Sequence, residues 1–342
     1  MSERKRVLSG MRPTGKLHLG HLVGALENWN ALQAEYDCFF MVADWHALMS
    51  EYEHPEAIRE ATYENVVDWL ACGIDPKKSV VFRQSDVPEH VELYAILSIL
   101  TPLGWVERVP TYKEQLRELE GRELATHGFL GYPILQAADI LLYRAHVVPV
   151  GEDQLSHLEL TREIVRRFQH LYRTEVFPEP QALLTKAPKL LGTDGRKMSK
   201  SYHNTINLSD SPEAIRKVAQ SMFTDPLRIK MIDPGHPETC NVCNYWRVFE
   251  TPEHAATLWD ACRTAKRGCV QNKQELADHL IALTEPFRAA RKRLGASVAE
   301  EMEQILQEGA KRARHAAWQT MAAVRRAIGF PTTRQADQVR VG

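Results

Sequence analysis

This sequence predicts an α/β protein in which a doubly wound parallel sheet is followed by an α-helical region. Its first half alternates short apolar runs with helical patterns, as βαβ units do. From residue 211 onward the patterns are mostly helical. The 342-residue chain is 44% apolar and 25% charged, which argues against disorder. Its length suggests about two domains.

Four short runs carry the prediction of strands: residues 7–8, 38–43, 79–82 and 147–150. The second run is continuously apolar, which is typical of a strand that is buried on both faces of a parallel sheet. The fourth run contains Pro149, which lacks the N–H that a central strand needs. We therefore expect a parallel sheet in which Pro149 is unfavourable for a central strand.

Helical patterns lie between and after these runs. Residues 55–72 predict a helix, because Pro55 suits a first turn and Gly73 suits a helix end. Residues 175–210 are rich in proline and glycine, and we interpret them as a mobile connector. The last long helix carries one apolar stripe at steps of three and four residues, formed by Leu306, Ala310, Ala313, Ala317, Met321, Val324 and Ile328.

The net charge of −1 conceals a basic end. Residues 311–342 carry seven Lys and Arg side chains against one Asp. A solvated helical face and a contact with a polyanion fit this pattern equally well. No apolar stretch approaches the roughly 18 residues of a membrane helix, and the start of the chain lacks the apolar core of a signal peptide. We expect a cytoplasmic protein that does not enter a membrane.

The first segment with chemical content is 9–21, where a strand ends, a glycine-containing turn follows and a helix begins near His18. Unpaired N–H groups and the helix dipole favour an anion at such a place. His18 and His21 lie one helical turn apart, so both can face the same phosphate. Alone, the segment fits an ordinary capped helix with two surface histidines better.

The second segment is 197–201, in which Lys197 and Lys200 flank a hydroxyl side chain. Two flexible cations at this spacing suit the charge that builds on a leaving pyrophosphate. Alone, the segment also fits a solvated basic loop.

Together the two segments resemble the signatures of the class I aminoacyl-tRNA synthetases. His18-Leu19-Gly20-His21 matches the first signature, and Lys197-Met198-Ser199-Lys200-Ser201 matches the second letter for letter. Both stand in the expected order on either side of an α/β region. The resemblance implies a Rossmann-like catalytic domain over 1–203, an α-helical anticodon-binding domain over 204–305, and a C-terminal helix over 306–342 that packs back on the first domain.

Two further runs resemble the tryptophanyl-tRNA synthetases, 132–143 and 148–162. The tyrosine enzymes usually show Gly-Gly-x-Asp-Gln where this chain has Gly151-Glu152-Asp153-Gln154. The resemblance implies that Asp139 accepts the N–H of an indole, which is the single polar group of that flat apolar ring. The other residues implied to bind tryptophan are Leu8, Gly10, His46, Tyr132, Gln136, Val148, Val150 and Gln154. His46 reads equally well as a structural histidine.

The same resemblance implies a two-step reaction: tryptophan and ATP give an adenylate and pyrophosphate, and tRNA(Trp) then accepts the amino acid. His18, His21, Lys197 and Lys200 would stabilise the phosphates, with Mg²⁺ carried on ATP. ATP would contact Met11, Arg12, Thr14, Gly20, His21, Gly151, Asp153, Lys197, Met198, Ser199 and Lys200. A homodimer is implied by the family alone. Arg288, Arg291, Lys292 and Arg293 are candidates for tRNA contact.

Two positions depart from the family pattern. Gln136 stands where many members have methionine, and Gln115 stands where some have a lysine that reaches ATP phosphates. Lys113 and Arg12 are candidates to replace that contact.

Four cysteines fall close together in the helical region: Cys240, Cys243, Cys262 and Cys269. Four thiolates that include a CxxC pair can hold zinc or an iron–sulfur cluster. Some bacterial tryptophanyl enzymes carry a four-iron four-sulfur cluster here, but their pattern ends in a CxxC where this chain has Asn272. Cys243 is the candidate for the fourth ligand, and four reduced cysteines without a metal are the alternative.

Three other functions compete with the leading hypothesis. A tyrosine-specific enzyme would share the fold. A non-catalytic paralogue would bind RNA without activating an amino acid, which the intact His18, His21, Lys197 and Lys200 argue against. A generic nucleotidyltransferase need not have a basic helical region.

Overall fold

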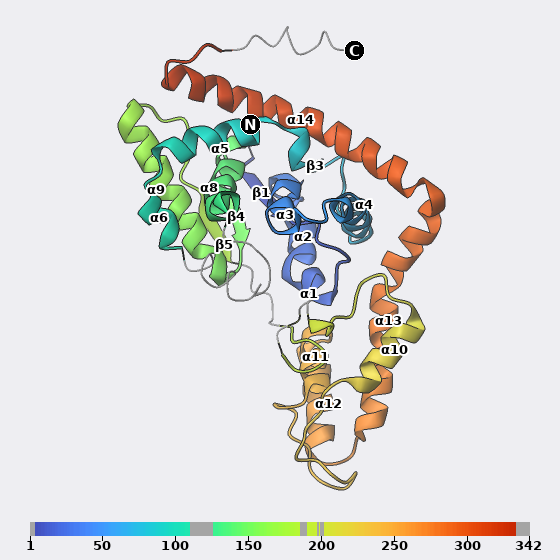
Figure 1. Ribbon diagram of the computed structural model, residues 1–342. Helices are drawn as coiled ribbons and strands as arrows, with labels where there is room; N and C mark the ends of the chain where they lie inside the picture. The colour runs from blue at the N-terminus through green and yellow to red at the C-terminus, as the bar shows by residue number, and fades with distance from the viewer. Residues whose placement is uncertain (1–3, 110–125, 185–189, 197, 199–201, 333–342) are drawn as a thin grey trace.

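The computed structural model describes residues 4–109, 126–184, 190–196, 198 and 202–332 (Figure 1). In these residues five strands form one parallel sheet in the order β3-β2-β1-β4-β5. The strands are β1 (Arg6–Met11), β2 (Asp37–Val42), β3 (Val80–Arg83), β4 (Val147–Val150) and β5 (Gln181–Leu184). The predicted α/β fold with a parallel sheet is confirmed.

Helices connect the strands and cover the sheet. In the first half they are α1 (Leu19–His21), the π-helical turn Leu22–Leu26, α2 (Glu27–Leu32), α3 (Asp44–Glu51), α4 (Glu56–Ala71), α5 (Glu89–Leu100), α6 (Leu103–Glu107), α8 (His127–Leu142) and α9 (Leu155–Tyr172). The chain adds β2 and β3 on one side of β1 and then crosses to β4 and β5 on the other. This reversal creates a switch point between β1 and β4, where ligands of α/β proteins commonly bind.

Two details of the sheet differ from simple expectation. Pro149 is tolerated in β4 because the pairing of β4 with β1 is confined to Val147, so no ladder on that side needs its N–H. The strand β5 lies in the segment that we interpreted as a connector. Its side chains are exposed or half-buried, so this edge strand lacks the continuous apolar run that marks a buried strand.

The helical region forms a narrower lobe below the sheet (Figure 1). It contains α10 (Pro212–Ser221), α11 (Asn241–Phe249), α12 (Pro252–Arg263) and α13 (Cys269–Leu294). The long helix α14 (Val298–Ala327) then returns along the sheet region. Six of the seven residues of the predicted apolar stripe are buried there, and Ile328 lies partly buried just beyond the helix end.

Helix α14 covers the edge strand β3. At Gly309 the helix backbone lies directly on this strand, because a Cβ there would sit 1.8 Å from the carbonyl oxygen of Val81. Side chains add further anchors: Arg312 donates to the carbonyls of Pro76 and Ser79, and Arg314 donates to that of Asp86. Two arginines of this basic helix therefore bind backbone carbonyls in the first half of the chain. No helix in the described residues is long and apolar enough to cross a membrane.

Candidate active site

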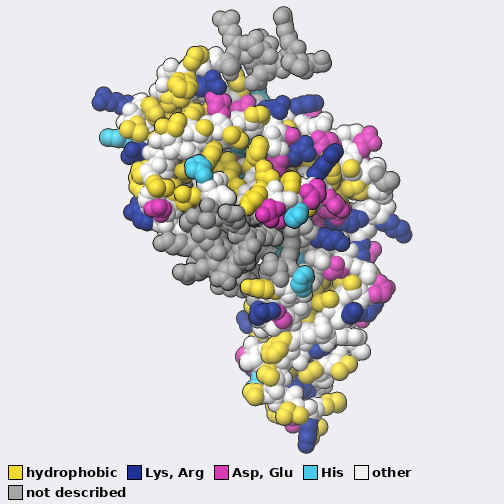
Figure 2. Space-filling model, viewed as in Figure 1, with side chains coloured by type: hydrophobic (Ala, Val, Ile, Leu, Met, Phe, Trp, Pro, Cys, Tyr) yellow, Lys and Arg dark blue, Asp and Glu magenta, His cyan; other side chains and the backbone are white. Residues whose placement is uncertain are grey.

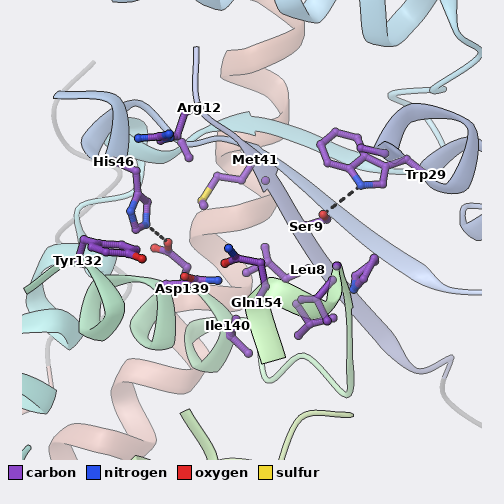
Figure 3. Close-up of a pocket in the computed structure, with 18 of the residues that line it drawn as sticks. Leu8, Ser9, Arg12, Trp29, Met41, His46, Tyr132, Asp139, Ile140 and Gln154 are labelled. Carbon is purple, nitrogen blue, oxygen red and sulfur yellow. Dashed lines mark hydrogen bonds and ion pairs between the residues drawn. The ribbon is translucent and has the colours of Figure 1, made fainter. Parts of the chain in front are cut away.

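A cavity of about 390 Å³ opens at the switch point between β1 and β4. The carboxyl ends of β1, β2 and β4 form its floor, and α3 and α8 form one side (Figure 3). The space-filling view shows apolar side chains gathered on this face of the upper lobe (Figure 2). The cavity is lined by all nine residues predicted for tryptophan, namely Leu8, Gly10, His46, Tyr132, Gln136, Asp139, Val148, Val150 and Gln154.

Asp139 is the buried acceptor of this cavity. Its side chain is about 3% exposed, yet its carboxylate receives three hydrogen bonds. Oδ2 accepts from His46 Nε2 at 2.7 Å, and Oδ1 accepts from His90 Nδ1 at 2.6 Å and Gln84 Nε2 at 2.7 Å. Burial alone would raise the pKa of the Asp139 carboxyl, but the hydrogen bonds and the nearby histidines hold it below its usual value. The carboxylate therefore stays ionised and accepts hydrogen bonds.

Sequence reasoning missed the two residues behind this carboxylate. Gln84 follows β3, and His90 lies in the first turn of α5. Both are fully buried, and His90 Nε2 also lies 2.7 Å from the hydroxyl of Tyr143. Buried polar side chains in an apolar helix are a usable signal, because such groups need partners. The sequence does not show which partners they have.

The half-buried Tyr132 and the buried His157 form a second pair at the cavity. The Tyr132 hydroxyl lies 2.9 Å from His157 Nε2, and the two rings also contact each other. Burial lowers the pKa of His157 to about 4. The imidazole is therefore neutral near pH 7, and its Nε2 can accept a hydrogen bond from the Tyr132 hydroxyl. This contact fixes the Tyr132 ring against the cavity.

The first signature segment is held by the chain that follows the second. Leu19 N–H donates to Ile206 O at 3.0 Å, and Leu208 N–H donates to Leu17 O at 2.9 Å. Met198 is buried, and a Cβ at Gly20 would meet its sulfur at 3.4 Å. Met198 of the second signature therefore lies beside Gly20 of the first, whereas Lys197, Ser199 and Lys200 lie outside the described residues.

The two histidines of the first signature organise the start of α1. His18 caps the helix: its Nδ1 accepts from Gly20 N–H at 3.1 Å, and its own N–H donates to His21 Nδ1 at 3.2 Å. The two rings lie 3.8 Å apart. The two tilted imidazoles thus lie together at one helix N-terminus, where an anion is favoured.

Two of the eight described residues predicted for ATP line the cavity. Arg12 and Gly151 line it, whereas Met11, Thr14, Gly20, His21, Asp153 and Met198 do not. Thr14 N–H donates to the carbonyl of Arg12 in the turn after β1. The Asp153 carboxylate accepts from the amide of Gln154 at 3.1 Å. Gln115 and Lys113 lie outside the described residues.

The structure adds lining residues that sequence reasoning did not select: Ser9, Gly24, Ala25, Asn28, Trp29, Met41, Ala43, Met49, Phe129, Ile140 and Pro149. Trp29 donates its indole N–H to the hydroxyl of Ser9 at 3.0 Å (Figure 3). Most of these residues are apolar and come from helices that cover the sheet. They were not expected in the site, because an apolar residue at the end of a core has the same sequence signal as one inside it.

The predicted metal site at the four clustered cysteines is not supported by the structure. Within the described residues, no group of three or more His, Cys, Asp or Glu side chains is placed to hold a metal ion. Asn272, at the position expected for a fourth thiolate, donates instead to Cys243 Sγ at 3.7 Å. The guanidinium of Arg228 lies 3.9 Å and 4.0 Å from the sulfurs of Cys262 and Cys269. Neither an iron–sulfur cluster nor zinc is supported here.

Two of the arginines proposed for tRNA contact are bound within the chain. Arg291 on α13 pairs with Glu64 and the buried Asp68 on α4. Arg288 donates to Thr284 Oγ1 and pairs with Glu285. Lys292 and Arg293 are exposed. Arg288 and Arg291 therefore have partners within the chain, and their contact with tRNA stays a prediction.

A helix N-terminus after the first strand, a cavity at the switch point and a buried carboxylate in that cavity together define a nucleotide-binding α/β enzyme site. Comparisons agree with this class. The family described as "tRNA synthetases class I (W and Y)" matches residues 1–285. The chain belongs to this family, within its tryptophanyl-tRNA synthetases.

Individual relatives support the narrower placement. A tryptophan–tRNA ligase of Thermotoga maritima is 51% identical to this chain over 95% of it and 99% of the relative. One of Aquifex aeolicus is 42% identical over 95% of this chain and 100% of the relative. The crystal structure of tryptophanyl-tRNA synthetase from Campylobacter jejuni, complexed with ADP and tryptophan, superposes with a TM-score of 0.85 at 34% identity. It covers 95% of this chain and 100% of its own.

Proposed function

We propose that this protein is a tryptophan–tRNA ligase. It activates L-tryptophan with ATP, releases pyrophosphate, and transfers the tryptophyl group to the 3′ end of tRNA(Trp). The observation that carries this proposal is the buried, ionised Asp139 carboxylate in a cavity whose other lining residues include many apolar side chains. An indole presents one N–H donor on an apolar body, and this cavity offers the matching acceptor.

The amino-acid end of the substrate lies toward the rim of the cavity. Tyr132, Gln136 and Gln154 supply hydroxyl and amide groups there for the ammonium and carboxylate. Phenylalanine fills the same space but has no N–H, so it leaves the acceptor direction of Asp139 Oδ2 that His46 does not use without a partner. An unpartnered buried acceptor costs about 1–3 kcal/mol, more when it is charged.

The first step needs no protein nucleophile. The tryptophan carboxylate attacks the α-phosphorus of ATP, a new C–O–P linkage forms, and the bond to the β-phosphate breaks to release pyrophosphate. His18 and His21 stabilise the phosphates at the start of α1, and Arg12 adds a cation at the cavity edge. Lys197 and Lys200 complete the clamp on the departing pyrophosphate. ATP enters as its magnesium complex, with mostly water around the ion.

The helical lobe supplies the contact with tRNA. We assign residues 1–203 to catalysis, 204–305 to the anticodon end, and 306–342 to the helix that ties the two together. The exposed Lys292 and Arg293 are the basic side chains of α13 left for a phosphate backbone. Because phosphate contacts release counterions, tRNA affinity should fall steeply with salt. Since tRNA and ATP are the substrates, we propose the cytoplasm as the compartment.

A homodimer is the proposed assembly. Val91, Ala95 and Ile99 form an exposed apolar stripe along α5, and Leu103 continues it in α6. Ile99 is 87% exposed, which is unusual for such a side chain. Patches of this kind often mark protein–protein contacts. Sedimentation of the wild type and of Ile99→Glu tests the assembly: the wild type should sediment as a dimer and the variant as a monomer.

One assay tests the proposed function. Exchange of labelled pyrophosphate into ATP is measured with a panel of tryptophan, tyrosine and phenylalanine. Exchange that depends on tryptophan is expected. Exchange that depends on tyrosine would favour the tyrosine-specific alternative, and no exchange with any amino acid would favour a non-catalytic RNA-binding protein.

A further inference from the structure

The two oxygens of the Asp139 carboxylate have different surroundings. Oδ2 accepts from His46, which lines the cavity, whereas Oδ1 accepts from His90 and Gln84, which do not. The lone pairs of a carboxylate oxygen take about two strong hydrogen bonds. Oδ1 is therefore fully occupied from behind, and Oδ2 retains one acceptor direction. The carboxylate is held so that its remaining acceptor belongs to the oxygen beside the cavity.

His90 is fixed from both sides of its ring. Its Nδ1 lies 2.6 Å from Asp139 Oδ1, and its Nε2 lies 2.7 Å from the hydroxyl of Tyr143. His90 and Tyr143 are both 0% exposed. Phe82 stacks on the imidazole with a centroid distance of 6.1 Å. An imidazole with this many contacts cannot turn without breaking a buried hydrogen bond.

The direction of the protons in this chain follows from Tyr143. Burial raises the pKa of the Tyr143 hydroxyl well above its usual value, and the charges of Asp139 and Glu89 add to the effect. The phenol therefore keeps its proton and can donate a hydrogen bond to His90 Nε2. A neutral imidazole that accepts at Nε2 must carry its proton on Nδ1. That N–H points at Asp139 Oδ1, so the hydrogen bonds from Tyr143 through His90 present a donor to the carboxylate.

We infer that His90 is a positioning residue for amino-acid selection. Together with Gln84 it orients the Asp139 carboxylate so that Oδ2 accepts the N–H of the substrate indole. This inference rests on the proposed function. It assigns a role to a side chain that touches neither tryptophan nor ATP and that acts through Asp139.

The test compares tryptophan with its analogue benzothienylalanine, in which sulfur replaces the indole N–H. In pyrophosphate exchange, His90→Leu should lower kcat/KM for tryptophan by about 10- to 100-fold, the range that corresponds to a lost charged hydrogen bond of roughly 1.5–3 kcal/mol. The value for the analogue and the KM for ATP should change less than about threefold, because neither uses the Asp139 acceptor. The preference for tryptophan should therefore shrink.

Two variants separate positioning from folding. His90→Asn keeps an N–H donor at the place of Nδ1 and should restore most of the preference. Leu93→Ala, one turn further along α5, removes fully buried packing without touching Asp139 and should leave the preference unchanged. An equal loss for tryptophan and the analogue in His90→Leu would overturn the inference. So would a preference that His90→Leu leaves intact.

Failure of the proposed function looks different. If the wild type does not activate tryptophan at all, the proposed function and this inference fall together. If the wild type activates tryptophan but the His90 variants keep its preference, the inference alone falls. Should His90→Leu not fold, nitrogen NMR of the wild-type imidazoles decides. The inference requires His90 to carry its proton on Nδ1, and a proton on Nε2 would overturn it.

Discussion

His46 Nε2 lies 2.7 Å from Asp139 Oδ2, and this contact joins α3 to α8 across the mouth of the cavity (Figure 3). Both side chains are largely buried, so the pair is desolvated. A buried carboxyl left alone would take up a proton and become a donor. With His46, His90 and Gln84 as donors, Asp139 remains an acceptor at the position proposed to bind the indole N–H.

Asp139→Asn tests this consequence. The amide places an N–H where an oxygen now faces donors, so the variant should lose the acceptor while keeping its shape. We expect kcat/KM for tryptophan in pyrophosphate exchange to fall by about 100-fold or more, in line with the loss of a charged buried hydrogen bond. The KM for ATP should stay close to its wild-type value. The exposed Asp260→Asn serves as the control. Unaltered discrimination against phenylalanine would remove Asp139 from the pocket.

His157 makes stability depend on pH. Its folded pKa of about 4 lies below the ordinary histidine value of 6.5, because burial disfavours the charged ring. As the pH falls through this window, the unfolded chain binds a proton that the folded chain refuses, so stability drops. The loss from this residue amounts to about 2 kcal/mol at pH 5.

Comparing His157→Gln with the wild type isolates the pH-dependent contribution of His157 to the free energy of unfolding. Glutamine keeps a polar partner for Tyr132 but does not titrate. Urea unfolding at pH 7.5 and pH 5 should therefore show the free-energy gap between the two proteins narrowing at the lower pH. A gap that stays constant would mean that His157 titrates normally in the folded protein.

The fold was largely predictable, and the reasons are physical. A strand buried on both faces must be apolar throughout, so β2 stands out in the sequence. Gly73 ends α4 with φ +102°, a conformation that favours glycine, so its sequence signal was also direct. β5 was missed because an exposed edge strand lacks that constraint. The apolar stripe of α14 was visible because one face of the helix packs on the sheet region.

The site divides differently. The family signatures led to the residues that line the cavity, but they did not reveal what holds them. His90 and Gln84 reach Asp139 from other elements, and no local pattern joins residues 49 or 55 positions apart. For the same reason the sequence did not show that Arg291 of α13 has acidic partners within the chain. A positive charge has the same sequence signal whether its partner is a phosphate or a buried Asp68.

A substitution of Arg291 tests whether its ion pairs with Glu64 and Asp68 stabilise the fold. Its guanidinium pairs with Asp68, which is 1% exposed, and with Glu64. Arg291→Met should lower the free energy of unfolding by about 3–5 kcal/mol, because it leaves a buried carboxylate uncompensated. The double variant with Asp68→Asn should recover part of that loss. By contrast, the exposed Arg293→Met should weaken tRNA binding and leave stability unchanged. A stable Arg291→Met with impaired tRNA binding would reverse the assignment.

Gly309 tests how closely α14 lies on β3. Alanine in a helix ordinarily stabilises relative to glycine by about 0.5–1 kcal/mol. At 309 the added methyl would meet the carbonyl of Val81, so the helix must shift. We expect Gly309→Ala to destabilise by about 1–3 kcal/mol in urea unfolding. Gly104, a helical glycine with no atom close to an added Cβ, is the matched control. Equal effects at both positions would contradict the close packing of α14 on the strand.

Lys200 tests the chemical step. Lys200 lies two residues after Met198 in the second signature. Met198 is buried beside Gly20 of the first signature, where we propose that the phosphates bind. Because the charge on the departing pyrophosphate builds in the transition state, a cation there raises the rate more than it raises binding. Lys200→Ala should slow tryptophan-dependent exchange by orders of magnitude, while calorimetry shows nearly unchanged tryptophan binding. Lys217→Ala on α10 should leave both unaltered. An unchanged exchange rate in Lys200→Ala would remove this loop from catalysis.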